Sequence, residues 1–112
     1  MTDCIFCKMV SGEMKPDIVY ENEQLLAFRD INPQAPVHIL IIPKAHISTL
    51  NDLKDTSLAG RLLQAVIKVA AQEGLADDGY RTVINCNEQG GQDVYHLHLH
   101  VLGRRQMRWP PG

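Results

Sequence analysis

The segment 95–102, Tyr-His-Leu-His-Leu-His-Val-Leu, alternates between polar and apolar side chains. Because a strand places successive residues on opposite faces, this period of two predicts a β-strand with one buried face. The apolar face carries Leu97, Leu99 and Val101. The other face carries His96, His98 and His100, with neighbouring imidazoles about 6.6 Å apart. Such a strand needs a cover for its apolar face, so the chain must form a sheet with a second layer.

The rest of the chain supplies the other strands and the covering layer. Apolar residues at steps of three and four from 55 to 73 predict an amphipathic helix that stops at Gly74, and a short helix is predicted at 4–11, before Gly12. Further strands are predicted at 18–20, 25–28, 37–42 and 80–86. The pattern therefore predicts an α+β fold, an antiparallel five-stranded sheet with one long helix and a short N-terminal helix.

Composition excludes several classes of protein. The 112 residues fit one domain, and no apolar run approaches the roughly 20 residues of a membrane span. The N-terminus lacks the features of a signal peptide, so we expect a cytoplasmic protein with no membrane partner. A net charge of -2 gives no basis for nucleic-acid binding. Three cysteines, an odd number, do not make a complete disulfide framework and are interpreted as thiols or metal ligands.

Three histidines on one strand face indicate chemistry rather than packing, because protonated rings in a row would repel one another. They could bind zinc together. Alternatively, one imidazole could attack phosphorus and carry a nucleotidyl group until water releases it. The preceding segment 85–92, Asn-Cys-Asn-Glu-Gln-Gly-Gly-Gln, is a glycine-rich turn whose backbone N–H groups can approach a phosphate closely. Beside the histidines, this turn favours the phosphate interpretation.

A family resemblance covers the chain essentially from end to end. The segment His96-Leu-His-Leu-His-Val-Leu matches the signature of the histidine triad superfamily, three histidines alternating with hydrophobic residues. Its nucleotide-binding branch is matched by 28–36, Phe-Arg-Asp-Ile-Asn-Pro-Gln-Ala-Pro, by 42–48, Ile-Pro-Lys-Ala-His-Ile-Ser, by Gly90-Gly-Gln, by Val94-Tyr-His, and by 105–112, Arg-Gln-Met-Arg-Trp-Pro-Pro-Gly. The resemblance implies a single histidine triad domain over 1–112 and a homodimer whose two sheets join.

The resemblance implies a purine nucleoside phosphoramidate hydrolase. The middle histidine of this family, here His98, attacks the α-phosphorus, and water then hydrolyses the covalent nucleotidyl-histidine to a nucleoside monophosphate. His96 and neighbouring backbone carbonyls would fix its tautomer, His100 would contact phosphate oxygens, and His46 would assist with charge or proton transfer. The attacking nitrogen must be unprotonated, and the flanking donors must stabilise charge on the phosphoryl oxygens. No cofactor is required.

Residues that bind the nucleotide are implied in the same way. Asp30 matches a carboxylate that accepts hydrogen bonds from the ribose hydroxyls. The purine slot is matched by Phe6, Phe28, Ile31 and, less firmly, Ile5, although core residues would look the same. The phosphate-side loop is matched by Asn85, Gly91 and Val94, the last two through backbone amides. Trp109 resembles a tail tryptophan that reaches towards the partner's active site.

One position departs from the family pattern. Asp93 stands where animal members of the family carry a serine, whose hydroxyl can donate to the phosphate or the leaving group. An ionised aspartate only accepts hydrogen bonds and would repel a phosphate by roughly 1–4 kcal/mol at ~4 Å. It could act protonated as the acid for the departing amine, or turn away. This departure leaves the leaving-group preference open.

The cysteines raise a second possible site. Cys4-Ile-Phe-Cys7 has the spacing of two zinc ligands, and His46 with His96 could complete a tetrahedron. This set of four resembles an arrangement in some bacterial members of the superfamily. Unligated thiols are the alternative to this structural zinc. Cys86 is interpreted as a buried strand residue. We interpret His38 as a hydrogen-bonded sheet residue outside the site.

Two other functions fit the same residues. A nucleotide-binding protein that regulates or contacts other proteins without catalysis would need the same pocket. A metal-dependent hydrolase would use the histidine row as ligands. Within the superfamily, the nearest enzymatic alternative is a dinucleoside polyphosphate hydrolase, although that branch lacks the Trp-Pro-Pro-Gly ending found here.

Overall fold

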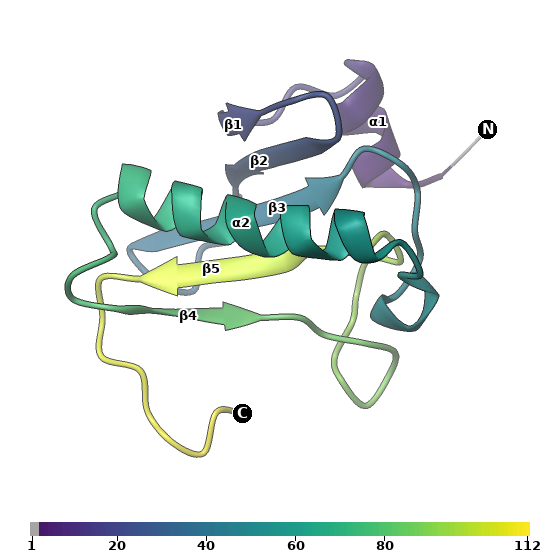
Figure 1. Ribbon diagram of the computed structural model, residues 1–112. Coiled ribbons are helices and arrows are strands. Elements are labelled where there is room, and N and C mark those ends of the chain that lie inside the picture. The colour runs from purple at the N-terminus through teal and green to yellow at the C-terminus, as the bar shows by residue number, and fades with distance from the viewer. Residues whose placement is uncertain (1–2) are drawn as a thin grey trace.

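The structure is a computed structural model that describes residues 3–112 (Figure 1). Its strands are β1 (Ile18–Glu21), β2 (Leu25–Arg29), β3 (Val37–Pro43), β4 (Tyr80–Val83) and β5 (Leu99–Gly103). They form one antiparallel five-stranded sheet in the order β1-β2-β3-β5-β4. The helices are α1 (Ile5–Ser11), the short 3-10 helix η1 (Leu50–Asp52) and α2 (Thr56–Gln72). The α+β fold predicted from the sequence is confirmed.

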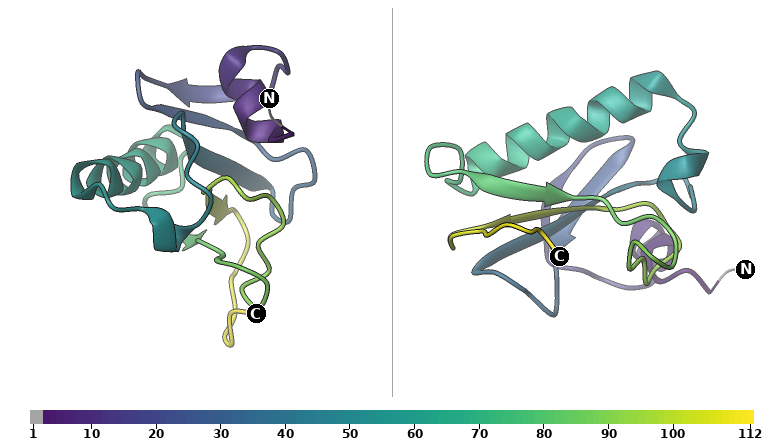
Figure 2. Two further views of the ribbon diagram at one scale, coloured as in Figure 1. Left: turned by 90° about the vertical axis from the view of Figure 1, so that its right-hand side faces the viewer. Right: turned by 90° about the horizontal axis from the view of Figure 1, so that it is seen from below.

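The two main helices cover opposite faces of the sheet (Figure 2). Helix α2 begins at Asp55, whose carboxylate accepts the N–H groups of Ser57 and Leu58, and it ends just before Gly74, whose φ of 76° favours glycine. Its apolar stripe packs on one face of the sheet. On the other face, α1 inserts Phe6 among apolar residues of β2 and β3. Among the described residues, no helix is long and apolar enough to cross a membrane.

The alternation in segment 95–102 is confirmed, but its strand is shorter than predicted. Leu97, Leu99 and Val101 lie in the core under α2. Strand β5 nevertheless starts at Leu99, because β3 pairs with it only from Leu99 to Gly103. His96 and His98 therefore precede the ladder, and the backbone carbonyl of His96 instead accepts from the ring of His98.

Strand β4 is also shorter than predicted. It ends at Val83, and residues 84–86 run as irregular chain into a turn at 87–91. The prediction that Cys86 is a buried strand residue is wrong, since it is only half-buried and lies outside the strand. Because β4 is an edge strand, its end depends on where β5 offers a partner, which its own sequence does not contain.

Candidate functional site

A cavity of about 360 Å³ lies on the α1 face of the sheet, the face opposite α2. Its apolar wall includes Phe6 and Phe28, whose rings meet edge to face with centroids 5.5 Å apart. Asp30, His98 and His100 supply polar groups to the same cavity. A mostly apolar cavity with a few convergent polar groups is the usual form of a small-molecule site.

His98 presents an unprotonated nitrogen to this cavity. Its Nδ1 lies 2.8 Å from the backbone oxygen of His96. Because a carbonyl oxygen only accepts, the proton of the neutral ring must be on Nδ1, and Nε2 keeps its lone pair. His98 is buried, and the ring of Phe6 packs edge to face against it with centroids 5.2 Å apart. The geometry fixes both the tautomer and the orientation that a nucleophile needs.

His100 presents the opposite group, an N–H donor. The backbone N–H of Gln34 donates to His38 Nδ1 at 3.0 Å, so the proton of neutral His38 is on Nε2. That Nε2–H donates to His100 Nδ1 at 2.9 Å, which leaves the proton of His100 on its own Nε2. Among the described residues, this buried Nε2 has no hydrogen-bond partner. It is available to an acceptor on a ligand.

Burial favours the neutral form of His38 and of His100. It lowers the pKa of His38, and it lowers the pKa of His100 to about 4, an effect to which the neighbouring His98 and His38 add. A charged ring at either position would lose its hydration without gaining a full partner. His38 is the hydrogen-bonded sheet residue that the sequence predicted, and it does not line the cavity. It acts on the cavity only through His100.

His96 does not line the cavity, and its side chain has no exposed surface. Its Nε2–H donates to the backbone oxygen of Pro43 at 2.8 Å, so the lone pair is on Nδ1 and faces the cysteines of α1. The expectation that His96 helps to fix the tautomer of His98 is met by its backbone carbonyl and not by its imidazole.

The four predicted zinc ligands lie together, with one donor atom from each within 4.8 Å of all the others. Cys4 Sγ is 3.3 Å from His96 Nδ1, and Cys7 Sγ is 3.2 Å from His46 Nδ1 and 3.6 Å from His96 Nδ1. Zinc bond lengths place sulfur and nitrogen ligands about 3.5 Å apart in a tetrahedron. The bond of His96 to Pro43 is also the outer-shell partner that fixes a metal-binding histidine. These residues fit a zinc ion.

Asp30 follows β2 at the edge of the cavity. One carboxylate oxygen accepts the backbone N–H of Asn32 at 2.8 Å, which forms a turn. The other lies 3.5 Å from His38 Nε2. Ile31, next in the chain, is 96% exposed at the cavity mouth, where Ile5 also lies. The structure therefore groups these residues as the sequence predicted.

The glycine-rich turn was expected to direct backbone N–H groups at a phosphate, but its hydrogen bonds are made within the turn and to neighbouring segments. A Cβ at Gly90 would lie 2.5 Å from the backbone oxygen of Cys86, so this glycine permits the close closure of the turn. The N–H of Gly91 donates to the oxygen of Glu88 and is used within the turn. The turn is itself fixed by Gln92, a buried residue whose amide donates to the backbone oxygens of Ser48 and Val94. Sequence reasoning counted Gln92 only as one amide among several and missed this role.

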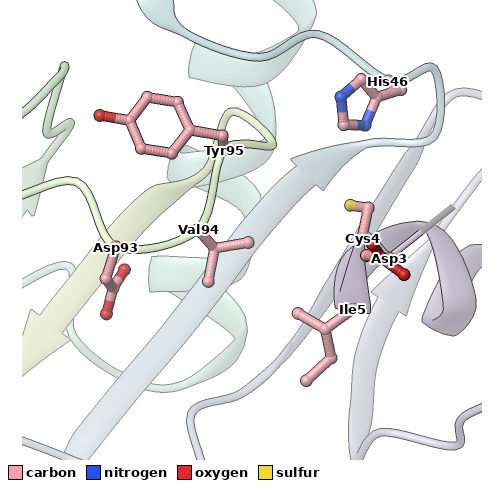
Figure 3. A pocket seen from close by; sticks show the side chains of 7 residues that line it. All are labelled: Asp3, Cys4, Ile5, His46, Asp93, Val94 and Tyr95. Atoms are coloured by element: carbon pink, nitrogen blue, oxygen red, sulfur yellow. The ribbon is translucent and has the colours of Figure 1, made fainter.

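Gln92 leads directly to the two loop residues that do reach the cavity, Asp93 and Val94. The Asp93 carboxylate lies 4.0 Å from His98 Nε2, and its side chain is 86% exposed. Three of the predicted nucleotide-binding residues are not brought to this cavity: Asn85, Gly91 and Trp109, the last 81% exposed. His46 lies instead on a neighbouring cavity (Figure 3).

Comparison with known proteins shows which family the chain is similar to. The model of the HIT domain family matches residues 11–107. A purine nucleoside phosphoramidase of Escherichia coli is 49% identical, over 94% of this chain and 90% of that protein. A 14 kDa zinc-binding protein of Brassica juncea is 51% identical, over 98% and 100%. The crystal structure of a HIT family hydrolase from Legionella pneumophila superposes with a TM-score of 0.95 at 54% identity, over 98% and 100% of the two chains. The chain therefore belongs to the HIT domain family.

Proposed function

We propose that this hydrolase cleaves purine nucleoside phosphoramidates through a covalent nucleotidyl intermediate on His98. The class, hydrolase, follows from relatives named phosphoramidase and HIT family hydrolase. The substrate and the intermediate are our proposal. The proposal rests on the hydrogen bond from His98 Nδ1–H to the backbone oxygen of His96, because this bond leaves the lone pair of Nε2 directed at the cavity.

The reaction has two balanced halves. The lone pair of His98 Nε2 forms a bond to the α-phosphorus while the P–N bond of the substrate breaks. The amine nitrogen takes that electron pair and a proton from solvent. Water then attacks phosphorus and releases a proton, and the electron pair of the N–P bond returns to Nε2. The net change adds hydroxide to phosphorus and a proton to the amine.

The other residues bind and orient the substrate. The Nε2–H of His100 is the donor for a phosphoryl oxygen, because it is buried and has no other acceptor among the described residues. A fixed donor stabilises charge that develops on that oxygen without reorganising. The edge-to-face rings of Phe6 and Phe28 offer a wall for the purine, and the Asp30 oxygen not used by the turn can accept from the ribose.

We also propose that Cys4, Cys7, His46 and His96 hold one zinc ion in a structural role. Bound there, the ion supplies a rigid cross-link between α1 and the segment before β5, both of which line the nucleotide cavity. The catalytic steps above need no metal. A single functional domain, a homodimer with Trp109 near the partner's site, and a cytoplasmic location stay predictions.

Turnover of a fluorogenic adenosine phosphoramidate tests the proposal. We expect His98→Ala to abolish turnover, and quenching of the parent with alkaline denaturant during turnover to trap adenylate on His98. His98→Asn serves as a second variant that retains a polar side chain of intermediate size. Activity of either variant within threefold of the parent would overturn the assignment. Nucleotide binding without turnover by the parent would favour a binding protein, and loss of turnover on chelation alone would favour a metal-dependent centre.

A further inference from the structure

A second cavity, of about 490 Å³, adjoins the nucleotide cavity (Figure 3). Ile5, Asp93 and Val94 line both cavities, so this loop and the start of α1 form the boundary between them. The second cavity is completed by Asp3, Cys4, His46 and Tyr95. Of the described residues that line it, none is a lysine or an arginine.

The position of the boundary determines what the second cavity can hold. A phosphorus atom in reach of His98 Nε2 lies about 3–3.5 Å from it. The nucleoside extends from that phosphorus towards Phe6, Phe28 and Asp30. The Asp93 carboxylate is 4.0 Å from the same Nε2, at the border of the second cavity. Because Asp93 and Val94 line both cavities, a group that departs from phosphorus away from the nucleoside has room in the second cavity, beside Asp93.

The charge of this cavity is negative. In Figure 3, Asp93 lies on one side of Val94 and Asp3 on the other. The thiolates of Cys4 and Cys7 do not add to this charge in the zinc-bound form, because two thiolates balance the two charges of the ion. Two carboxylates favour a leaving group that is cationic and oppose one that is anionic.

We propose that the second cavity is the leaving-group subsite and that Asp93, assisted by Asp3, makes the enzyme select phosphoramidates of cationic amines over substrates with anionic leaving groups. The inference rests on the proposed function and names its substrate class. The departing amine takes one proton as the P–N bond breaks and a second from solvent to become an ammonium ion, so the carboxylate of Asp93 also stabilises this product of the first half-reaction. A polyphosphate leaving group would meet two like charges and no lysine or arginine among the described residues of this cavity.

Three matched substrates test this selection. They are adenosine phosphoramidates of diaminobutane, aminobutanol and aminobutyrate, which share a linker and differ in a terminal charge that is positive, absent or negative. Two charges about 5 Å apart in water change an equilibrium by about fourfold. Because the first and last substrates differ by two charges, we expect Asp93→Asn to lower the ratio of their kcat/KM values by about sixteenfold, which corresponds to about 1.7 kcal/mol.

Control variants separate charge selection by Asp93 from the effect of changing the net charge of the protein. Asp77→Asn removes the same charge from an exposed position that lines neither cavity, and it should leave the ratio within twofold of the parent. Asp3→Asn should lower the ratio by a smaller factor than Asp93→Asn, and high salt should compress the parent's ratio. A parent that turns over all three at equal rates, or an Asp93→Asn ratio within twofold of the parent's, overturns the inference alone. No turnover of any of the three overturns the proposed function as well.

Discussion

His38 is the residue whose replacement tests the site most directly, because it acts on the ligand only through His100. Its side chain is 5% exposed and makes two hydrogen bonds, one from the Gln34 N–H and one to His100 Nδ1. The change His38→Phe keeps an aromatic ring and removes both partners. We expect two consequences, one for stability and one for nucleotide binding.

The magnitudes follow from the groups left without partners. The Gln34 N–H and His100 Nδ1 each lose a hydrogen bond, at about 1–3 kcal/mol for a group that stays buried, and the Gln34 N–H will recover part of this from water. Without a donor at Nδ1, the proton of His100 is no longer confined to Nε2. The bond from that N–H to a phosphoryl oxygen is of the charge-assisted type, about 1.5–3 kcal/mol, so AMP should bind at least tenfold more weakly.

Three measurements separate positioning from damage to the fold. Calorimetric titration with AMP gives the affinity, and thermal unfolding gives the stability. Nitrogen NMR of the imidazoles reports which nitrogen of His100 carries the proton. His38→Gln is the matched variant, since its amide can donate to His100 Nδ1 and should restore both the tautomer and most of the affinity. If His38→Phe folds, binds AMP as tightly as the parent and keeps the Nε2–H tautomer of His100, the hydrogen-bond chain from Gln34 has no role in binding.

Four further outcomes are expected. Asp30→Ala should weaken AMP binding by about 1–3 kcal/mol. The variant should bind AMP and 2′-deoxy-AMP equally well, because it lacks the carboxylate that accepts from the ribose hydroxyls. If it prefers AMP over 2′-deoxy-AMP as strongly as the parent does, Asp30 does not contact the ribose. Cys7→Ser should reduce zinc from one ion per chain and lower the melting temperature, as measured by elemental analysis and calorimetry, whereas an unchanged zinc content would refute the ligand set. The unfolded chain takes up a proton at His100 near pH 6.5, but the folded chain does so only near about 4, because burial lowers this pKa. The free energy of unfolding should therefore fall as pH drops through this window, by less than about 1.4 kcal/mol per pH unit after solvent screening. Denaturant titrations at several pH values should show that the unfolding free energy of His100→Asn depends less steeply on pH than that of the parent. Gly103→Ala should destabilise the chain by about 1–3 kcal/mol, since its Cβ would lie 2.6 Å from the buried side chain of Leu75; an unchanged denaturation midpoint would contradict this.

Local patterns were sufficient to predict the five strands, helices α1 and α2, and the packing of α2 on the sheet. The period of two in segment 95–102 assigned its apolar residues to the core, and the three- and four-residue steps of 55–73 predicted α2 within a residue at each end. Strand ends were less accurate. Strand β4 ends and β5 begins where a partner strand offers hydrogen bonds, and that partner is distant in sequence.

The sequence predicted which residues lie at the cavity better than it predicted what each side chain does there. Resemblance grouped Asp30, Phe6 and Phe28 with the histidines, and the structure places all of them on one cavity. It assigned no role to the Gln92 side chain and none in the site to His38, and these residues contribute through hydrogen bonds to residues 44 and 62 positions away. Such bonds have no periodicity in sequence, so no spacing rule reveals them.

The sequence by itself determined that three histidines share a face, since alternation in a strand requires nothing beyond the chain's own geometry. Only the tertiary structure decided what each one offers. His96 directs a lone pair at two cysteines, His98 directs a lone pair at the cavity, and His100 directs an N–H there. Identical side chains differ in this way because a neutral imidazole carries its proton on whichever nitrogen faces an acceptor. The groups that decide it, the carbonyls of Pro43 and His96 and the amide of Gln34, come into place only when the chain has folded.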